Sequence, residues 1–102
     1  MAYRIEQHIP KGELAAFCLR HHVQRLALFG SAQRGELKPD SDVDFLIEFE
    51  EGHIPGLFDL SRMEIELTDM LGRQADLRTP EELSRHFRDE VARTAEVQYE
   101  RA

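Results

Sequence analysis

A regular alternation of side chains between residues 42 and 50 constrains the fold more than any other feature of the sequence. Apolar residues occupy every second position and would line one face of an extended strand: Val43, Phe45, Ile47 and Phe49. The intervening positions would line the opposite face: Asp42, Asp44, Leu46 and Glu48. We therefore predict a strand with one buried face, which must belong to a sheet.

Two further strands are predicted, one before and one after this alternating segment. A short apolar run over residues 23–29 ends at Gly30 and is typical of a mostly buried strand. Residues 74–78 form a shorter segment of the same kind. Residues 31–41 are polar and are expected to be a connection with at most one helical turn. The expected sheet is therefore small, mixed and three-stranded.

Helices are predicted where apolar residues recur every three or four positions, over residues 10–22 and 57–71. The second helix would end at Gly72 and align one face: Leu57, Leu60, Glu64, Leu67 and Leu71. A capping box beginning at Thr79 would open another helix, and residues 87–101 are expected to be helical too. The order of the elements favours an α/β (α+β) fold with helices packed on the sheet.

Length and composition narrow the possible classes of protein. The 102 residues contain no repeat, low-complexity tract or linker, so a single domain over residues 1–102 is expected. The net charge of -7, from 20 acidic and 13 basic residues, argues against a general binder of long nucleic acid. No apolar run reaches the roughly 18–20 residues that span a bilayer, and the N-terminus lacks the apolar core of a signal peptide. With Cys18 as the only cysteine, these features favour a cytoplasmic location.

A glycine–serine pair directly follows the first predicted strand. Gly30 would let the backbone approach a ligand closely, and the Ser31 hydroxyl could donate a hydrogen bond to a phosphate oxygen. Backbone N–H groups at a helix start attract phosphate as well. Taken alone, such a pair is more often an ordinary turn.

Three aspartates fall at or on two of the predicted strands. Asp42 and Asp44 are two residues apart, so their side chains project from one face about 6–7 Å from each other. Two like charges this close repel unless a cation lies between them, and Mg²⁺ prefers carboxylate and phosphate oxygens. Asp76 stands between two apolar residues and needs a partner or a water-filled cleft. The alternative is that all three are solvated acids, with Asp76 on an edge strand.

The combination of these features is more specific than its parts. Ten residues separate Ser31 from Asp42, and the segments 28–35 and 41–47 together resemble the signature of the DNA polymerase beta nucleotidyltransferase superfamily. Within it, the chain resembles the minimal nucleotidyltransferases, short proteins often paired with HEPN-domain toxins. The resemblance extends from the first predicted helix to the segment opened by Thr79.

The resemblance implies a polymerase-beta-type nucleotidyltransferase core and assigns roles to the residues of the signature. Gly30 and Ser31 would hold the triphosphate of ATP, the expected substrate. Asp42 and Asp44 would bind two Mg²⁺ ions. Asp76 matches the third carboxylate of the family, which shares a metal ion and helps to deprotonate the acceptor hydroxyl.

Arg34 matches a position that is usually basic in these short proteins. It could neutralise phosphate charge, and a surface ion pair is the alternative reading. The implied reaction transfers AMP from ATP to a hydroxyl and releases pyrophosphate, and two metal ions can stabilise both the attacking and the leaving oxygen.

The resemblance also implies a partner. The acceptor would be a hydroxyl of a cognate HEPN toxin, with tyrosine expected, so that the chain acts as an antitoxin in a hetero-oligomer. A non-catalytic antitoxin that inhibits the toxin by binding alone is the alternative. The set of acids favours the enzyme, because a binding surface does not need carboxylates that repel one another. Transfer to a small molecule is not expected, since no acceptor-binding domain is predicted.

Overall fold

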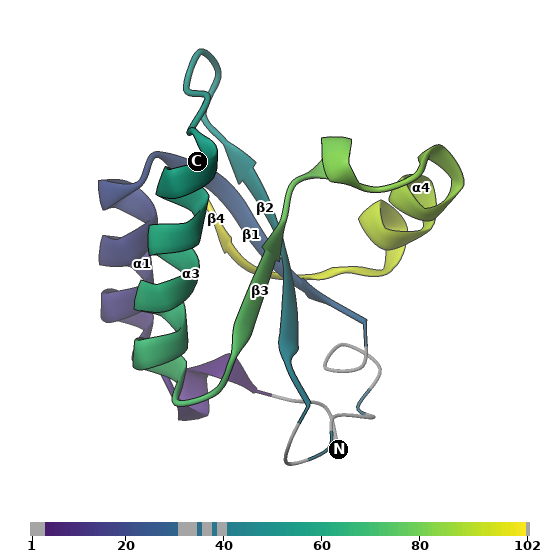
Figure 1. Ribbon diagram of the computed structural model, residues 1–102. Coiled ribbons are helices and arrows are strands. Elements are labelled where there is room, and N and C mark those ends of the chain that lie inside the picture. Colours follow the sequence, from purple (N-terminus) through teal and green to yellow (C-terminus); the bar gives the residue numbers. More distant parts are fainter. Residues whose placement is uncertain (1–3, 31–34, 36–37, 39–40, 102) are drawn as a thin grey trace.

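One mixed sheet forms the centre of the structure (Figure 1). The computed structural model describes residues 4–30, 35, 38 and 41–101. Among these residues the four strands follow the order β3-β2-β1-β4, with the bounds β1 Val23–Phe29, β2 Val43–Phe49, β3 Ala75–Arg78 and β4 Glu96–Glu100. β1 is antiparallel to both of its neighbours, whereas β2 and β3 are parallel. The mixed sheet and the α/β class are confirmed, with one strand more than the sequence predicted.

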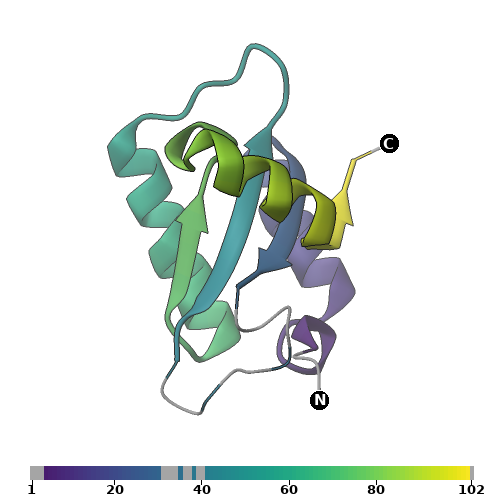
Figure 2. The ribbon, with the colours of Figure 1, turned by 90° about the vertical axis from the view of Figure 1, so that its right-hand side faces the viewer.

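Helices lie on both faces of the sheet. α1 (Lys11–Arg20) and α3 (Leu57–Leu71) cover one face, and α4 (Arg85–Thr94) crosses the other, as Figure 2 shows. The predicted helices over 10–22 and 57–71 are confirmed with slightly shorter bounds for the first. α3 ends as predicted at Gly72, whose left-handed φ of 77° suits a residue without a side chain. In the described part of the chain, no helix combines the length and the apolar character that crossing a membrane requires.

The main core lies between the sheet and the helices α1 and α3. The alternating face of β2 supplies its centre, with Val43, Phe45 and Ile47 fully buried. Burial of each such side chain stabilises the fold by about 1.5–3 kcal/mol. A second, smaller cluster lies on the opposite face, where Val91 of α4 packs with Phe29 and Leu46. The two-sided packing explains why β2 also carries an apolar residue on its otherwise acidic face.

The prediction of a helix over residues 87–101 is wrong beyond residue 94. α4 ends at Thr94, and residues 96–100 form β4, which pairs with β1 through Leu26 opposite Tyr99 and Ala27 opposite Val97. β1 would otherwise have an unpaired edge, so its backbone groups offer hydrogen bonds that the isolated segment cannot find. This long-range pairing overrides the weak helical pattern.

The capping box at Thr79 is present but does not open a long helix. The backbone N–H of Thr79 donates to Glu82 Oε1 at 3.2 Å, around the short 3₁₀ turn η2 (Pro80–Glu82). An extended Leu83 then interrupts the helical path, and α4 begins only at Arg85. A second 3₁₀ turn, η1 (Ile5–Gln7), precedes α1.

Candidate functional site

The three aspartates meet at one end of the sheet, on the face that α4 crosses. In the register of the sheet, Asp44 of β2 lies beside Asp76 of β3 and opposite Phe29 of β1. Ala75 and Leu77 point into the main core, so Asp76 points to the opposite face, as does Asp44. Asp42 precedes β2 by one residue and is exposed. Asp44 and Asp76 are partly buried.

The carboxyl groups of Asp42 and Asp76 lie close enough to influence each other. Partial burial raises the pKa of Asp76, and the negative charge of Asp42 and a side-chain hydrogen bond with it raise it further. The charge of Glu64 acts in the same direction, while Arg78 opposes it. The site therefore concentrates negative charge that only a cation or a proton can balance.

Gly30 closes the other side of the site, directly after β1. Its φ is 72°, a left-handed conformation that side chains disfavour. A β-carbon placed on Gly30 would stand only 2.8 Å from Asp44 Oδ2, so this carboxylate lies against the Gly30 backbone. The backbone angle thus favours glycine here, and any side chain at this position would displace the Asp44 carboxylate.

Four of the six candidate residues are described by the structure and are brought together: Gly30, Asp42, Asp44 and Asp76. Ser31 and Arg34 lie outside the described residues, and their roles remain predictions. Among the described residues, no three His, Cys, Asp or Glu side chains enclose a common point as a metal cage would. Mg²⁺ is commonly held by one or two carboxylates, water and substrate phosphate, so this donor set still fits it.

One residue of this region was not found from the sequence. Glu64 of α3 was placed on the apolar face of its helix, but its Oε2 accepts a hydrogen bond from the backbone N–H of Leu77 at 2.8 Å. The same oxygen lies 3.9 Å from Arg78 Nη1. The available signal was an acid within an apolar stripe, which needs a polar partner when it packs against a sheet.

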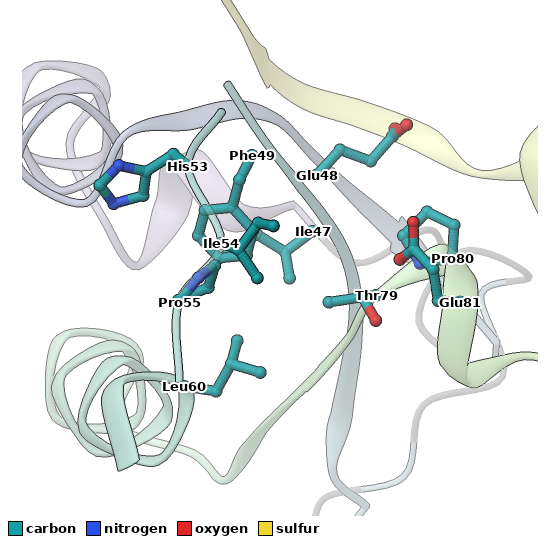
Figure 3. Close-up of a pocket in the computed structure, with 10 residues that line it drawn as sticks. All are labelled: Ile47, Glu48, Phe49, His53, Ile54, Pro55, Leu60, Thr79, Pro80 and Glu81. Atoms are coloured by element: carbon teal, nitrogen blue, oxygen red, sulfur yellow. The ribbon is translucent and has the colours of Figure 1, made fainter. Parts of the chain in front are cut away.

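A pocket of about 530 Å³ lies at the opposite end of β2 (Figure 3). Its lining is mostly apolar, with two glutamates: Ile47, Glu48, Phe49, His53, Ile54, Pro55, Leu60, Thr79, Pro80 and Glu81. It includes none of the four described candidates, so the chemistry of the aspartates is separate from this pocket.

Cys18 lies in the main core. Its side chain is fully buried, and burial raises the pKa of the thiol to about 12. A thiol that stays protonated is a poor nucleophile. Cys18 is therefore a packing residue of the core.

Comparisons with known sequences place the chain in a family. Residues 12–99 match the model of the nucleotidyltransferase domain. MJ0435 of Methanocaldococcus jannaschii, provisionally named a protein adenylyltransferase, is 36% identical over 85 residues, which are 83% of this chain and 89% of the relative. The protein adenylyltransferase MntA of Thermococcus cleftensis is 47% identical over 58 residues, or 57% of each chain.

Solved structures share the fold. A structure described provisionally as a minimal nucleotidyltransferase superimposes with a TM-score of 0.70 at 36% identity, over 83% of this chain and 85% of the other. A toxin–antitoxin structure with AMP-PNP has a TM-score of 0.73 at 16% identity, over 91% and 75%. An MNT antitoxin in complex with the tri-AMPylated HEPN toxin of Shewanella oneidensis has a TM-score of 0.64 at 14% identity, over 89% and 70%. The sequence match over most of the chain and the shared fold agree: the chain belongs to the nucleotidyltransferase domain family and is a nucleotidyltransferase.

Proposed function

We propose that the protein transfers AMP from ATP to a hydroxyl group of a partner HEPN toxin and thereby acts as its antitoxin. The observation that carries the proposal is the grouping of Asp42, Asp44 and Asp76 on one face, with the Asp44 carboxylate against the backbone of Gly30. A nucleotidyl transfer needs anionic groups for cations and a backbone that a triphosphate can approach, and this end of the sheet combines both.

We assign a role in the reaction to each of the three aspartates. Asp42 and Asp44 would hold Mg²⁺, and Asp76 would share a cation and accept the proton of the acceptor hydroxyl. Partial burial and the charge of Asp42 raise the pKa of Asp76 in the metal-free protein, and a carboxylate beside the acceptor hydroxyl can act as its general base. When bound, Mg²⁺ supplies positive charge that stabilises the transferred phosphoryl group and the leaving pyrophosphate.

Gly30, with Ser31 and Arg34, would orient the triphosphate. The acceptor oxygen then attacks the α-phosphorus in line with the bond to the departing oxygen. A bond forms between the acceptor oxygen and the α-phosphorus, and the bond to pyrophosphate breaks with its electron pair. The products are AMP esterified to the acceptor and free pyrophosphate.

The names of the relatives support the proposed toxin partner and the proposed substrate ATP. Two sequence relatives carry the name protein adenylyltransferase, one solved neighbour is a toxin–antitoxin pair with an ATP analogue, and another contains an AMPylated HEPN toxin. We extend this to a toxin encoded beside the present chain, with tyrosine as the acceptor and a hetero-oligomer as the assembly. The cytoplasmic location expected from the sequence is part of the same proposal.

A non-catalytic antitoxin is the competing function. It would explain the same fold and the same partner, but it offers no reason to keep three aspartates grouped at one end of the sheet, where Asp42 and Asp76 repel each other.

The decisive experiment incubates the protein with its toxin, Mg²⁺ and ATP labelled in the α-phosphate. Label is expected to move to the toxin with the native protein and not with the double variant Asp42→Asn/Asp44→Asn. Glu48→Gln is the matched control, because Glu48 lies on the same face of β2 and forms an ion pair with Arg25 away from the site. Inhibition of the toxin by native and double-variant protein alike, without label transfer, would establish the binding-only antitoxin.

A further inference from the structure

The outer edge of β3 is held by side chains of α3. β3 has four residues and is an edge strand, with β2 as its only strand neighbour among the described residues. Its backbone N–H groups at Ala75 and Leu77 donate to Thr68 Oγ1 at 3.0 Å and to Glu64 Oε2 at 2.8 Å. Figure 1 shows α3 running alongside β3, with the strand returning from the end of the helix. The helix therefore provides the hydrogen bonds that a fifth strand would otherwise supply.

The spacing of the two acceptors matches the spacing of the two donors. Glu64 and Thr68 are four residues apart, which is about 6 Å along a helix and keeps both on the same side. Ala75 and Leu77 are two residues apart, which is about 6.6 Å along a strand. The pairs match only in one alignment of the helix and the strand, so both bonds would break if β3 slipped.

Asp76 lies between the two anchored amides. A slip of one residue would turn its side chain from the site into the core, and a slip of two would move it by about 6.6 Å. A parallel edge strand of four residues has few hydrogen bonds of its own to prevent such slips. The register that places Asp76 beside Asp44 therefore depends on contacts outside the sheet.

We propose that Glu64 and Thr68 are positioning residues, which hold β3 in the register that places the Asp76 carboxylate beside Asp42 and Asp44. The proposal rests on the proposed nucleotidyl transfer for its catalytic consequence, but the anchor itself is testable without it. Glu64 has a second contact that strengthens the anchor, because its carboxylate lies 3.9 Å from Arg78 at the end of the same strand.

The acceptor and the charge of Glu64 have separable effects. Its oxygen anchors the strand, whereas its negative charge lies near an already acidic site. Glu64→Gln keeps an oxygen that can accept the Leu77 N–H, and Glu64→Ala removes it. Glu66→Ala is the matched control, because Glu66 lies on the same helix but binds Arg20 and His21 of the α1 end.

The experiment measures two quantities for these variants. The first is the hydrogen-exchange rate of the Leu77 amide, measured by NMR. The second is the affinity for Mn²⁺ in the presence of ATP, measured from the electron paramagnetic resonance signal of free Mn²⁺. Glu64→Ala is expected to speed the exchange of the Leu77 amide about tenfold, because it removes one hydrogen bond worth about 1–1.5 kcal/mol. It is also expected to weaken Mn²⁺ binding several-fold. Glu64→Gln is expected to stay within about twofold of the native values, and Glu66→Ala to change neither.

The outcomes are decisive in both directions. Native Mn²⁺ affinity in Glu64→Ala would overturn the proposal whatever the exchange rate of Leu77, as would an equal loss of Mn²⁺ affinity in Glu66→Ala. Thr68→Val, which replaces the hydroxyl by a methyl group, is the substitute test if Glu64→Ala does not fold. Its expected result is faster exchange of the Ala75 amide together with weaker Mn²⁺ binding. A native protein that binds Mn²⁺ and ATP but transfers no AMP would refute the proposed function while leaving this test intact.

Discussion

The Oδ2 oxygen of Asp44 lies 2.8 Å from the position that a β-carbon on Gly30 would occupy. The two residues belong to neighbouring strands, since Asp44 pairs with Phe29, the last residue of β1. A candidate metal ligand and the glycine of the signature are thus in direct contact. Any change at Gly30 must displace the carboxylate, and this relationship leads to the first prediction.

Gly30→Ala is expected to reduce AMP transfer by at least about tenfold, because a misplaced ligand of this kind costs one to two orders of magnitude. It should also destabilise the fold by about 1–2 kcal/mol, since the left-handed φ is unfavourable for alanine. Gly72→Ala is the control: Gly72 has a similar φ of 77°, but its added β-carbon would meet nothing within 4 Å. Activity assays measure the loss of AMP transfer, and urea denaturation measures the loss of stability. An equal loss of activity in Gly72→Ala would show that backbone strain, and not displacement of Asp44, lowers the activity.

Asp76→Asn is expected to stabilise the metal-free protein near neutral pH while abolishing AMP transfer. The pKa of Asp76 is raised above 3.8 in the folded state, so the folded protein holds this proton more tightly than the unfolded chain does. The native protein therefore loses stability as the pH rises above about 4. The variant should therefore have a higher Tm than the native protein at pH 7. The advantage should disappear below pH 4.

Thermal unfolding between pH 3 and pH 8, without and with Mg²⁺ and ATP, measures this difference. Asp69→Asn, an exposed acid on α3, should show no comparable pH-dependent gain. A variant less stable than the native protein at pH 7 without metal would contradict the destabilising role assigned to the Asp76 charge.

Cys18 is expected to be inert in the folded protein. Its thiol is buried and its pKa is raised to about 12, so the thiolate fraction at pH 8 is far below that of a free cysteine. A disulfide reagent such as Ellman's reagent should react at least about a hundredfold more slowly than with the urea-unfolded chain. Equal rates in both states would show that the core opens around α1.

Val91→Ala is expected to destabilise the protein by about 1–2 kcal/mol, because Val91 is 3% exposed and packs α4 against Phe29 and Leu46. Val97→Ala on β4 is the matched control, since Val97 is 42% exposed and should cost less than about 1 kcal/mol. Urea denaturation gives both values. Equal costs would indicate that α4 is not firmly packed on the face that carries the aspartates.

Much of the fold could be predicted because its signals are local. The alternation around Phe45 follows from the two-residue period of a strand, and the end of α3 at Gly72 follows from the left-handed conformation that glycine adopts readily. The signature around Gly30 and Asp42 was also recognisable in the sequence, as a resemblance to a known family carried by the residues 28–35 and 41–47. Each of these features involves residues that are near one another in the chain.

β4 and the anchor of β3 could not be predicted in the same way. Residues 96–100 become a strand only because the free edge of β1 offers hydrogen bonds, and β1 lies about seventy positions earlier in the chain. Glu64 appears in the sequence as an interruption of an apolar stripe, and its role depends on a backbone N–H of Leu77 on another element. Such pairings are set by packing rather than by local pattern.

The sequence by itself determined the types of the central elements, the acidic face of β2 and the identity of the residues in the signature, because side-chain periodicity and residue chemistry are local properties. Only the tertiary structure decided that Asp76 lies beside Asp42 and Asp44, that Gly30 contacts Asp44, and that α3 holds the edge strand. The physical reason is that these relationships depend on strand register and helix packing, which are fixed by hydrogen bonds and burial between distant parts of the chain.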